Sequence, residues 1–298
     1  MKLDIVTANS WKNKVLDIVF EALAESDVVV DCLVFKGARV LNKRLRTYSR
    51  QSLDIDANML TEFVKKHESY SELRDILGME IEEAINNYFE KQDPVVFTLD
   101  KIKIIKKPHN DHKLGRDAFE VIISVKDLSR ANVRGLPNLK IDIAAPEELG
   151  KASISSLDVG CGTVKAYTLE RIAGEKLRAF LSSLPAYRKK VSKPGKAIRA
   201  KDIYDIARIL EQYPISTKMF WGKVGKEFRR ACKSRYIDCL GKDTFEEDVL
   251  ITKGTYNADQ AMSEDISFDE AWESLQEIIT YLVESKIIPF SYSLPGSE

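Results

Sequence analysis

The sequence of 298 residues predicts an α+β fold, in which a mixed α/β half is followed by a helical half. Three segments are rich in β-branched residues and bounded by turn-forming residues, which predicts strands at 94–108, 118–129 and 136–146. From about Tyr167 onward, apolar residues recur at helical spacing instead, over 168–184, 201–212, 219–235 and 268–286. We therefore expect two domains, residues 1–166 and 167–298.

The first ninety residues predict a series of shorter elements. Apolar residues at helical spacing predict a helix near 10–25, and the run VVVDCLVF predicts a strand at 28–35. Gly37 follows, and then a helix through Leu41 and Leu45. A strand over 50–58 comes next, before a long charged helix within 61–91 in which Gly78 is a possible break.

Composition excludes several classes of protein. Lys+Arg and Asp+Glu are equal at 46 each, so the chain lacks the general basic excess of a nucleic-acid coat protein. We see no uninterrupted apolar stretch that would serve as a signal peptide or membrane span, and we expect a cytoplasmic protein with no membrane partner. The four cysteines form no C-x-x-C pair and indicate reduced thiols. His109 and His112 form an H-x-x-H, for which a solvated loop is the better interpretation.

Basic residues are nevertheless clustered locally. One cluster lies in the loop before residue 202 and comprises Arg188, Lys189, Lys190, Lys193, Lys196, Arg199 and Lys201. A second comprises Lys223, Lys226, Arg229, Arg230, Lys233 and Arg235, and a third comprises Arg39, Lys43, Arg44, Arg46 and Arg50. Such runs are usually solvated surface, and charge alone favours that interpretation. The alternative is polyanion binding, since Lys and Arg beside carboxylates suit phosphates.

The stretch RQSLDIDAN at 50–58 suggests the chemistry. If it is a strand, Ser52, Asp54 and Asp56 share one face, with the two carboxylates about 7 Å apart. Like charges this close repel, and bound Mg²⁺ would relieve the repulsion because it prefers carboxylate, phosphate and water oxygens. D-x-D alone is a weak signal, since it occurs often by chance.

Two further features strengthen the hypothesis. Asp142 stands between Ile141 and Ile143 on another predicted strand, and would add a third carboxylate if that strand neighbours the first. Gly37 lies between a strand and a helix, where a glycine lets backbone N–H groups approach a phosphate. Together these features predict a holder for a metal–nucleotide.

With these motifs in order, the chain resembles the AbiEii-type toxin nucleotidyltransferases, within the DNA polymerase β-like superfamily. That family has a Gly-Gly-Ser/Thr motif, followed by four further motifs that this sequence matches at R50-Q-S-L-D-I-D56, K140-I-D-I143, G174-E-K-L-R-A179 and R199-A-K-D-I-Y-D-I206. The resemblance runs from about residue 30 to 210. It implies a polymerase β-like mixed sheet with helices, a helical C-terminal domain, and an active site in the cleft between the two.

The first motif departs from the family pattern. Ala38 and Arg39 occupy the positions of the second Gly and the Ser/Thr, while Leu41 and Lys43 fit. A hydroxyl that would hydrogen-bond phosphate is thus replaced by a long cation. Arg39 either binds phosphate bidentately or points away and weakens the loop.

The resemblance also implies roles for individual residues. Asp54, Asp56 and Asp142 would be metal ligands in a two-metal site, with Lys176 and Asp202 as further catalytic residues. The nucleotide would be bound by Gly37, Arg39, Lys43, Arg50, Ser52 and Lys176. The residues alone favour Lys176 as a surface lysine whose stem packs on apolar side chains, and they allow Asp202 to be a helix cap. Tyr204 and Asp205 are expected to be scaffold.

The predicted activity is NTP-dependent transfer of a nucleoside monophosphate with release of pyrophosphate. The resemblance favours tRNA as the acceptor and implies a separately encoded antitoxin as partner. The basic loop would hold the RNA backbone through Arg188, Lys189, Lys190, Lys193, Lys196 and Arg199. Two alternatives stay open. The acceptor could be a protein or small molecule, or the chain could be a non-catalytic binding protein of the same fold.

Overall fold

The computed structural model describes residues 3–46, 50–108, 117–130, 132–133, 135–188, 197–259, 262 and 265–292. The chain divides into two compact units. The first consists of Met1–Leu149 and Ile154–Tyr167, and the second of Gly150–Ser153 and Thr168–Glu298. The segment Gly150–Ser153 therefore belongs to the second unit, although the strands before and after it in the sequence belong to the first.

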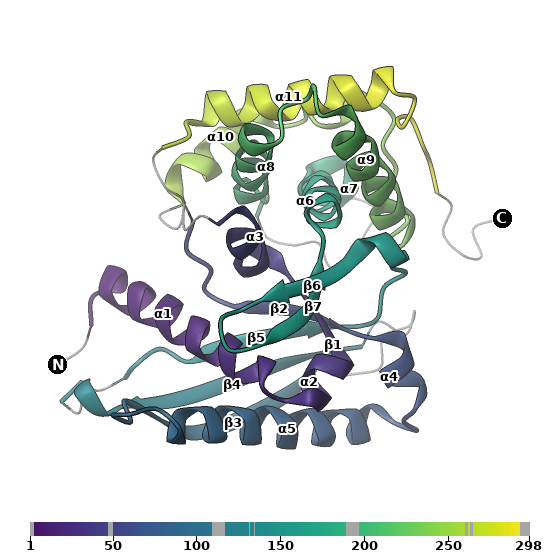
Figure 1. Cartoon of the computed structure of the whole chain (residues 1–298). Coiled ribbons are helices and arrows are strands. Elements are labelled where there is room, and N and C mark those ends of the chain that lie inside the picture. Colours follow the sequence, from purple (N-terminus) through teal and green to yellow (C-terminus); the bar gives the residue numbers. More distant parts are fainter. Residues whose placement is uncertain are drawn as a thin grey trace. The chain divides into compact units, whose positions relative to one another are not determined.

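The first unit is built on a seven-stranded mixed sheet with the order β3-β4-β5-β2-β1-β7-β6 (Figure 1). Strand β5 runs parallel to β2 and β7 parallel to β1, whereas the other neighbours are antiparallel. The strands are β1 (Leu33–Lys36), β2 (Ile55–Met59), β3 (Phe97–Lys107), β4 (Ala118–Asp127), β5 (Leu139–Ala144), β6 (Ile154–Asp158) and β7 (Thr163–Tyr167).

Helices pack against this sheet through apolar side chains, which alternate with more exposed ones along a strand. On β5, Leu139, Ile141 and Ile143 are buried while the residues between them are partly exposed, as expected for a strand with two different faces. Helix α5 packs against β3 and lies along the sheet (Figure 1). The helices of this unit are α1 (Ile5–Ala24), α2 (Asp27–Cys32), α3 (Gly37–Leu45), α4 (Thr61–Lys65) and α5 (Tyr70–Glu90).

The strand predicted at 28–35 is only half correct. Residues Asp27–Cys32 form helix α2, and the strand begins at Leu33. Ser26 caps the helix because its hydroxyl accepts a hydrogen bond from Val29 N, and Asp27 in the first turn suits the positive end of the helix dipole. These local interactions outweigh the β preference of the three valines.

The strand predicted at 50–58 begins later than expected, at Ile55. Upstream backbone groups bond to side chains and not to a neighbouring strand. Arg50 O accepts from Asn42 Nδ2, and Ser52 N donates to Asn13 Oδ1. Ser52 and Asp54 are therefore not strand residues, and Asp54 occupies a bend before β2.

Two other elements differ from expectation. Helix α5 runs without interruption through Gly78, and the charged stretch breaks earlier, between α4 and α5. The hairpin of β6 and β7 was not predicted from the sequence.

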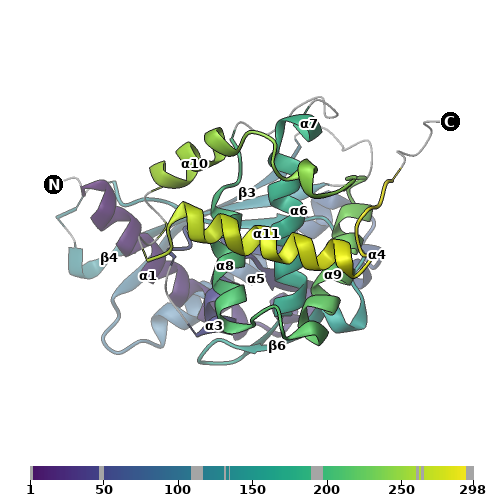
Figure 2. The ribbon, with the colours of Figure 1, turned by 90° about the horizontal axis from the view of Figure 1, so that it is seen from above.

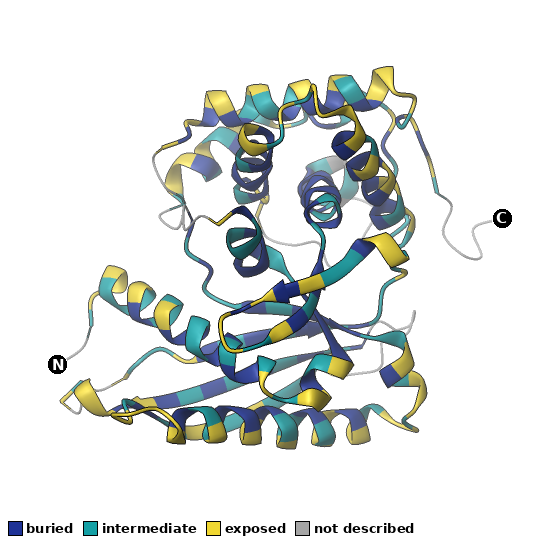
Figure 3. Ribbon diagram, viewed as in Figure 1, coloured by how far each residue is buried: buried dark blue, intermediate teal, exposed yellow. Residues whose placement is uncertain are grey.

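The second unit is helical, as expected, and Figure 2 shows α11 lying across α8, α6 and α9. Its helices are α6 (Leu169–Ser183), α7 (Pro185–Arg188), α8 (Lys201–Gln212), α9 (Lys218–Lys233), α10 (Val249–Ala258) and α11 (Phe268–Glu284). The buried faces of α6, α8 and α9 meet in its core (Figure 3). Short 3₁₀ turns lie at Leu128–Arg130 in the first unit, and at Lys151–Ser153 and Lys242–Thr244 in the second. The prediction of an α+β fold with a helical C-terminal part is confirmed.

A buried ion cluster holds the segment Gly150–Ser153 to this unit. Ser153 Oγ donates to the Glu227 carboxylate at 2.9 Å, and Arg171 Nη1 lies 3.3 Å from the same group. Arg230 also pairs with Glu227. Because Arg171 is fully buried, this cluster compensates charges that would otherwise be costly to remove from water.

None of the helices in the described ranges combines the length and the low charge needed to cross a bilayer.

Candidate functional site

Three carboxylates converge on one face of the sheet in the first unit. One carboxylate oxygen from each of Asp54, Asp56 and Asp142 lies within 4.8 Å of the other two. Strand pairing brings this about, because β5 lies beside β2 in parallel and Asp142 is directly opposite Asp56. Asp142 was expected to join the cluster only if its strand lay beside the D-x-D segment, and it does. Asp54 joins from the bend before β2.

This donor set fits a divalent metal. All three side chains are partly exposed, so that an ion can reach them and retain water. Carboxylate oxygens are the ligands that hard cations such as Mg²⁺ prefer, and three negative charges this close are unfavourable without a compensating cation.

Lysines compensate part of that charge. Lys140 Nζ lies 2.7 Å from Asp142 Oδ2 and 3.0 Å from Glu120 Oε2, and Glu120 is opposite Asp142 in the register of β4 and β5. Hydrogen bonds from Lys107 and Lys140 lower the pKa of Glu120. Lys12 of α1 is half-buried close by, where burial lowers its pKa while the charge of Asp54 opposes that shift.

Gly37 sits directly against the cluster. Its φ is +80°, a left-handed conformation that favours glycine, and an added Cβ would lie 2.1 Å from Asp56 Oδ2. Lys36 is opposite Asp56 in the register of β1 and β2. The strand–Gly–helix turn therefore places the first residue of α3 next to a metal-ligand candidate, as a phosphate-binding turn requires.

Arg39 is turned toward α1. Its buried guanidinium pairs with Asp17 and donates to Ser52 O and to Asn13 Oδ1, the last at 3.3 Å. Asn13 Oδ1 also accepts from Ser52 N at 3.2 Å. In this structure Arg39 thus holds the segment before β2 against α1.

The other nucleotide-binding candidates also have contacts within the first unit. Ser52 is buried, and its Oγ donates to Asp54 O at 3.1 Å, which helps set the bend that carries Asp54. Arg50 is buried as well, and Lys43 Nζ lies 3.4 Å from Val159 O.

Lys176 and Asp202 belong to the second unit, where they form a buried ion cluster. Lys176 Nζ lies 2.9 Å from Asp202 Oδ1 and 2.6 Å from Asp205 Oδ2, and Arg199 Nε donates to Asp202 Oδ2 at 2.5 Å. Burial alone would raise the pKa of Asp202, but the charges and hydrogen bonds of Lys176 and Arg199 hold it well below its usual range. Both carboxylates are almost fully buried.

Most of the predicted RNA-binding loop, namely Lys189, Lys190, Lys193 and Lys196, lies outside the described residues, as do His109 and His112. The same holds for the side chain of Arg188. Arg199, from the same set, is engaged by Asp202.

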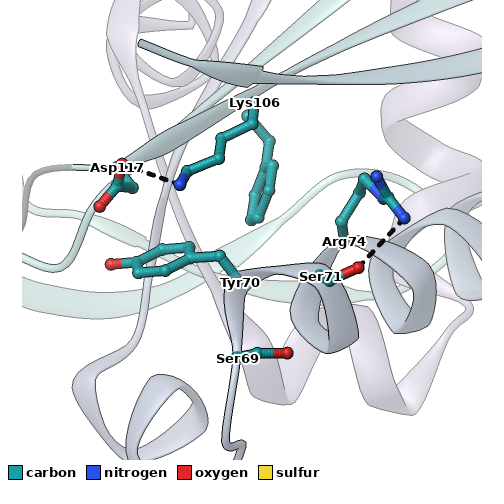
Figure 4. A pocket seen from close by; sticks show the side chains of 7 residues that line it. Ser69, Tyr70, Ser71, Arg74, Lys106 and Asp117 are labelled. Carbon is teal, nitrogen blue, oxygen red and sulfur yellow. Dashed lines mark hydrogen bonds and ion pairs between the residues drawn. The ribbon is translucent and has the colours of Figure 1, made fainter. Parts of the chain in front are cut away.

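A pocket of about 480 Å³ opens at the start of α5 (Figure 4). Lys106 crosses it, with Nζ 3.4 Å from Asp117 and 5.4 Å from the centre of the Tyr70 ring. Phe119, which also lines the pocket, points to the opposite face of the sheet from Glu120, because neighbouring strand residues alternate. None of the predicted site residues lines this pocket.

Sequence reasoning missed Lys12, Glu120 and Lys140. A signal existed for Lys140, because it is two residues from Asp142 on one strand and must share its face. Glu120 depends on the register between β4 and β5, and Lys12 on how α1 packs. Neither of these can be read from local pattern.

Comparison with known proteins agrees with this geometry. A family model described as nucleotidyl transferase AbiEii toxin, type IV TA system, matches residues 21–285, which confirms the resemblance. The crystal structure of JHP933 from Helicobacter pylori is 16% identical, covers 94% of this chain and 93% of that chain, and gives a TM-score of 0.51.

A second solved structure is an antigenic nucleotidyltransferase-like protein from Paracoccidioides brasiliensis, at 14% identity and a TM-score of 0.36. It covers 68% of this chain and 77% of that chain. No curated protein matches. The family model and the JHP933 structure together confirm the nucleotidyltransferase fold predicted from the motifs.

Gly37→Ala should abolish binding of Mn²⁺ by the carboxylate cluster, measured by calorimetry with Mn²⁺ as the probe. The new Cβ would strain a positive φ and displace Asp56. Gly135→Ala is the matched control, since Gly135 has a φ of +74° and nothing within 4 Å of its added Cβ. Equal Mn²⁺ affinity in the two variants would show that contact with Asp56 is irrelevant.

Lys140→Met should raise the affinity for Mn²⁺ by about tenfold, because it removes a positive charge that competes for Asp142. Lys103→Met removes one exposed lysine from β3 and should leave that affinity unchanged. A fall in Mn²⁺ affinity in Lys140→Met would mean that Lys140 instead supports the ligand geometry of Asp142.

Lys176→Met should lower the free energy of unfolding by about 3–5 kcal/mol at pH 7, because it leaves two carboxylates buried without their ammonium partner. The same substitution at Lys253, whose pair with Asp269 is exposed, should cost less than about 1 kcal/mol. Chemical denaturation measures both.

The sign of the pH dependence follows from Asp202. Its folded-state pKa is depressed, so its contribution to stability is complete above the unfolded-state pKa near 4 and is lost as the pH falls below it. The deficit of Lys176→Met should therefore be largest at neutral pH and shrink in acid. A deficit independent of pH would contradict the electrostatic account.

Proposed function

The chain belongs to the AbiEii family of toxin nucleotidyltransferases of type IV toxin–antitoxin systems, and from that premise we propose that it transfers a nucleoside monophosphate from an NTP to RNA. The reaction is Mg²⁺-dependent, tRNA is the favoured acceptor, and a separately encoded antitoxin opposes it. Transfer to cellular RNA requires that the protein act in the cytoplasm.

One observation carries the proposal: Asp54, Asp56 and Asp142 converge beside the Gly37 turn. Bound Mg²⁺ would supply neutralisation of triphosphate charge and alignment of the reacting oxygens. Asp54 and Asp56 would hold the ion that accompanies the triphosphate. Asp142, directly opposite Asp56, would complete the second metal site or accept the proton of the acceptor hydroxyl.

The bonds made and broken are those of phosphoryl transfer. The acceptor oxygen forms a bond to the α-phosphorus, and the bond from that phosphorus to the bridging oxygen breaks. Pyrophosphate leaves with the electron pair. The protein contributes mainly position and charge, because little covalent chemistry falls to its side chains.

Cations near the cluster suit the triphosphate. Lys12 and Lys140 lie close to the carboxylates, and we assign them to the phosphates together with the backbone of Gly37. Arg39 is not assigned to phosphate, since Asp17 and Ser52 engage its guanidinium. Lys176 and Asp202 enter the proposal through the family motifs, with Asp202 and Asp205 orienting the lysine.

The test is a transfer assay with each of the four α-labelled NTPs, Mg²⁺, total tRNA and cell protein. The wild type is compared with Asp54→Asn/Asp56→Asn. Glu82→Gln/Glu83→Gln is the matched control, because it removes two exposed carboxylates of α5. We expect label on RNA with the wild type and the control, and at least a thousandfold less with the aspartate variant, because it lacks the carboxylates that would hold the charge-neutralising ion.

Other outcomes are equally informative. Label on protein would retain the chemistry and replace the acceptor. No label from folded wild type with any NTP would overturn the catalytic proposal and favour a binding protein of the same fold.

A further inference from the structure

Helix α9 carries a line of exposed cations that the proposed chemistry does not use. We define the basic stripe as Lys218, Lys226, Arg229 and Lys233, all of which are exposed. Their spacing places them on one side of the helix, over about 22 Å at the usual rise per residue. The opposite side of α9 is buried through Trp221, Val224, Phe228 and Ala231 (Figure 3).

The stripe is not neutralised by the protein. Across the described residues, no ion pair involves any of its four members, whereas Lys223 lies 3.5 Å from Glu170 and Arg230 pairs with Glu227. The single acidic residue of α9, Glu227, is buried and bound to Arg171. The neighbouring helix α11 carries exposed acidic residues, but none is ion-paired with the stripe.

The stripe is rigidly joined to the helix that carries Lys176. Helices α6 and α9 approach so closely at Gly174 that an added Cβ would lie 2.5 Å from Phe228 N. Gly174 is two residues before Lys176 on α6. A ligand held by the stripe is therefore fixed relative to a predicted catalytic residue of the same unit, without a flexible loop between them.

We propose that the basic stripe binds the sugar–phosphate backbone of the acceptor RNA. The inference rests on the proposed function and deepens it by naming a surface for the acceptor. Extended rows of unpaired Lys and Arg suit evenly spaced phosphates. A protein partner fits less well, since protein interfaces are depleted in Lys and have an apolar centre. On α9, the residue that helical spacing places among the four stripe cations is Gly222, which offers no apolar side chain. Arg229 also lies over the Phe290 ring, 5.8 Å from its centre, which fixes its direction.

The test measures RNA binding without nucleotide, so that it does not depend on catalysis. Fluorescently labelled bulk tRNA is titrated with wild type and with Lys218→Gln/Lys226→Gln/Arg229→Gln/Lys233→Gln at several salt concentrations. The matched control is Lys65→Gln/Lys66→Gln/Lys101→Gln/Lys103→Gln, which removes four exposed charges from the first unit.

For the stripe variant we expect the affinity at 0.1 M salt to fall at least tenfold, and the slope of log K against log salt to become shallower by about 3, since four phosphate contacts are lost. The control should match the wild type in both. The stripe variant should keep the same thermal stabilisation by Mg²⁺ and NTP as the wild type, because its substitutions leave the carboxylates intact.

Equal tRNA affinity for the stripe variant and the control would overturn the inference, even if the wild type labels RNA. Failure of wild type to bind tRNA would overturn it as well. If the stripe variant loses tRNA but the transfer assay labels only protein, the stripe is an RNA-binding surface and the proposed acceptor is wrong. If Asp54→Asn/Asp56→Asn transfers label as well as the wild type but the stripe variant loses tRNA, the proposed chemistry is wrong and the inference about the stripe stands.

Discussion

The first unit depends on one electrostatic constraint: three carboxylates must share a small volume without driving the sheet apart. Asp56 and Asp142 are forced together by the parallel pairing of β2 and β5, which buries apolar residues on the other face of the same strands. The cost of that pairing is met locally, because Lys140 bridges Asp142 and Glu120 while Lys12 approaches from α1. An acidic cluster compensated by flexible lysines exchanges those partners for a metal ion more readily than one held by a buried, planar Arg.

Seen in this way, Arg39 explains how the chain accommodates a departure from the family motif. A Ser or Thr at that position would be too short to join Asp17 of α1 to the segment before β2, and the hydrogen bond from Ser52 N to Asn13 Oδ1 would be left to connect them. Arg39 supplies the connection through Asp17, Asn13 and Ser52, and the bend that presents Asp54 depends on it through Ser52. In this structure Arg39 thus acts as scaffold, and α1, which it contacts through Asp17 and Asn13, carries Lys12 near the cluster.

Motifs with strict alternation could be interpreted from the sequence, and those that depend on long-range packing could not. Asp56 and Asp142 follow from strand patterns, and Gly37 from its place between strand and helix. The prediction that the strand includes Ser52 was wrong because Asn13 and Arg39, distant in sequence, take the backbone groups that a strand would use. Similarly, the three valines predicted as strand form part of helix α2, because the Ser26 cap outweighs their β preference over a single turn.

The buried ion cluster around Lys176 and Asp202 limits what a loss of activity in a single variant can mean. Lys176 and Arg199 supply two positive charges, and Asp202 and Asp205 two negative ones, so the set is neutral only when complete. Removing one member leaves an uncompensated charge in the interior, which is much more costly than replacing a whole pair by neutral groups. A single substitution at Lys176 or Asp202 therefore combines any catalytic loss with a structural one. The two effects are separated by exchanging Lys176 and Asp202 together for neutral groups of similar size, because any loss of transfer is then measured in a chain whose interior charges still balance.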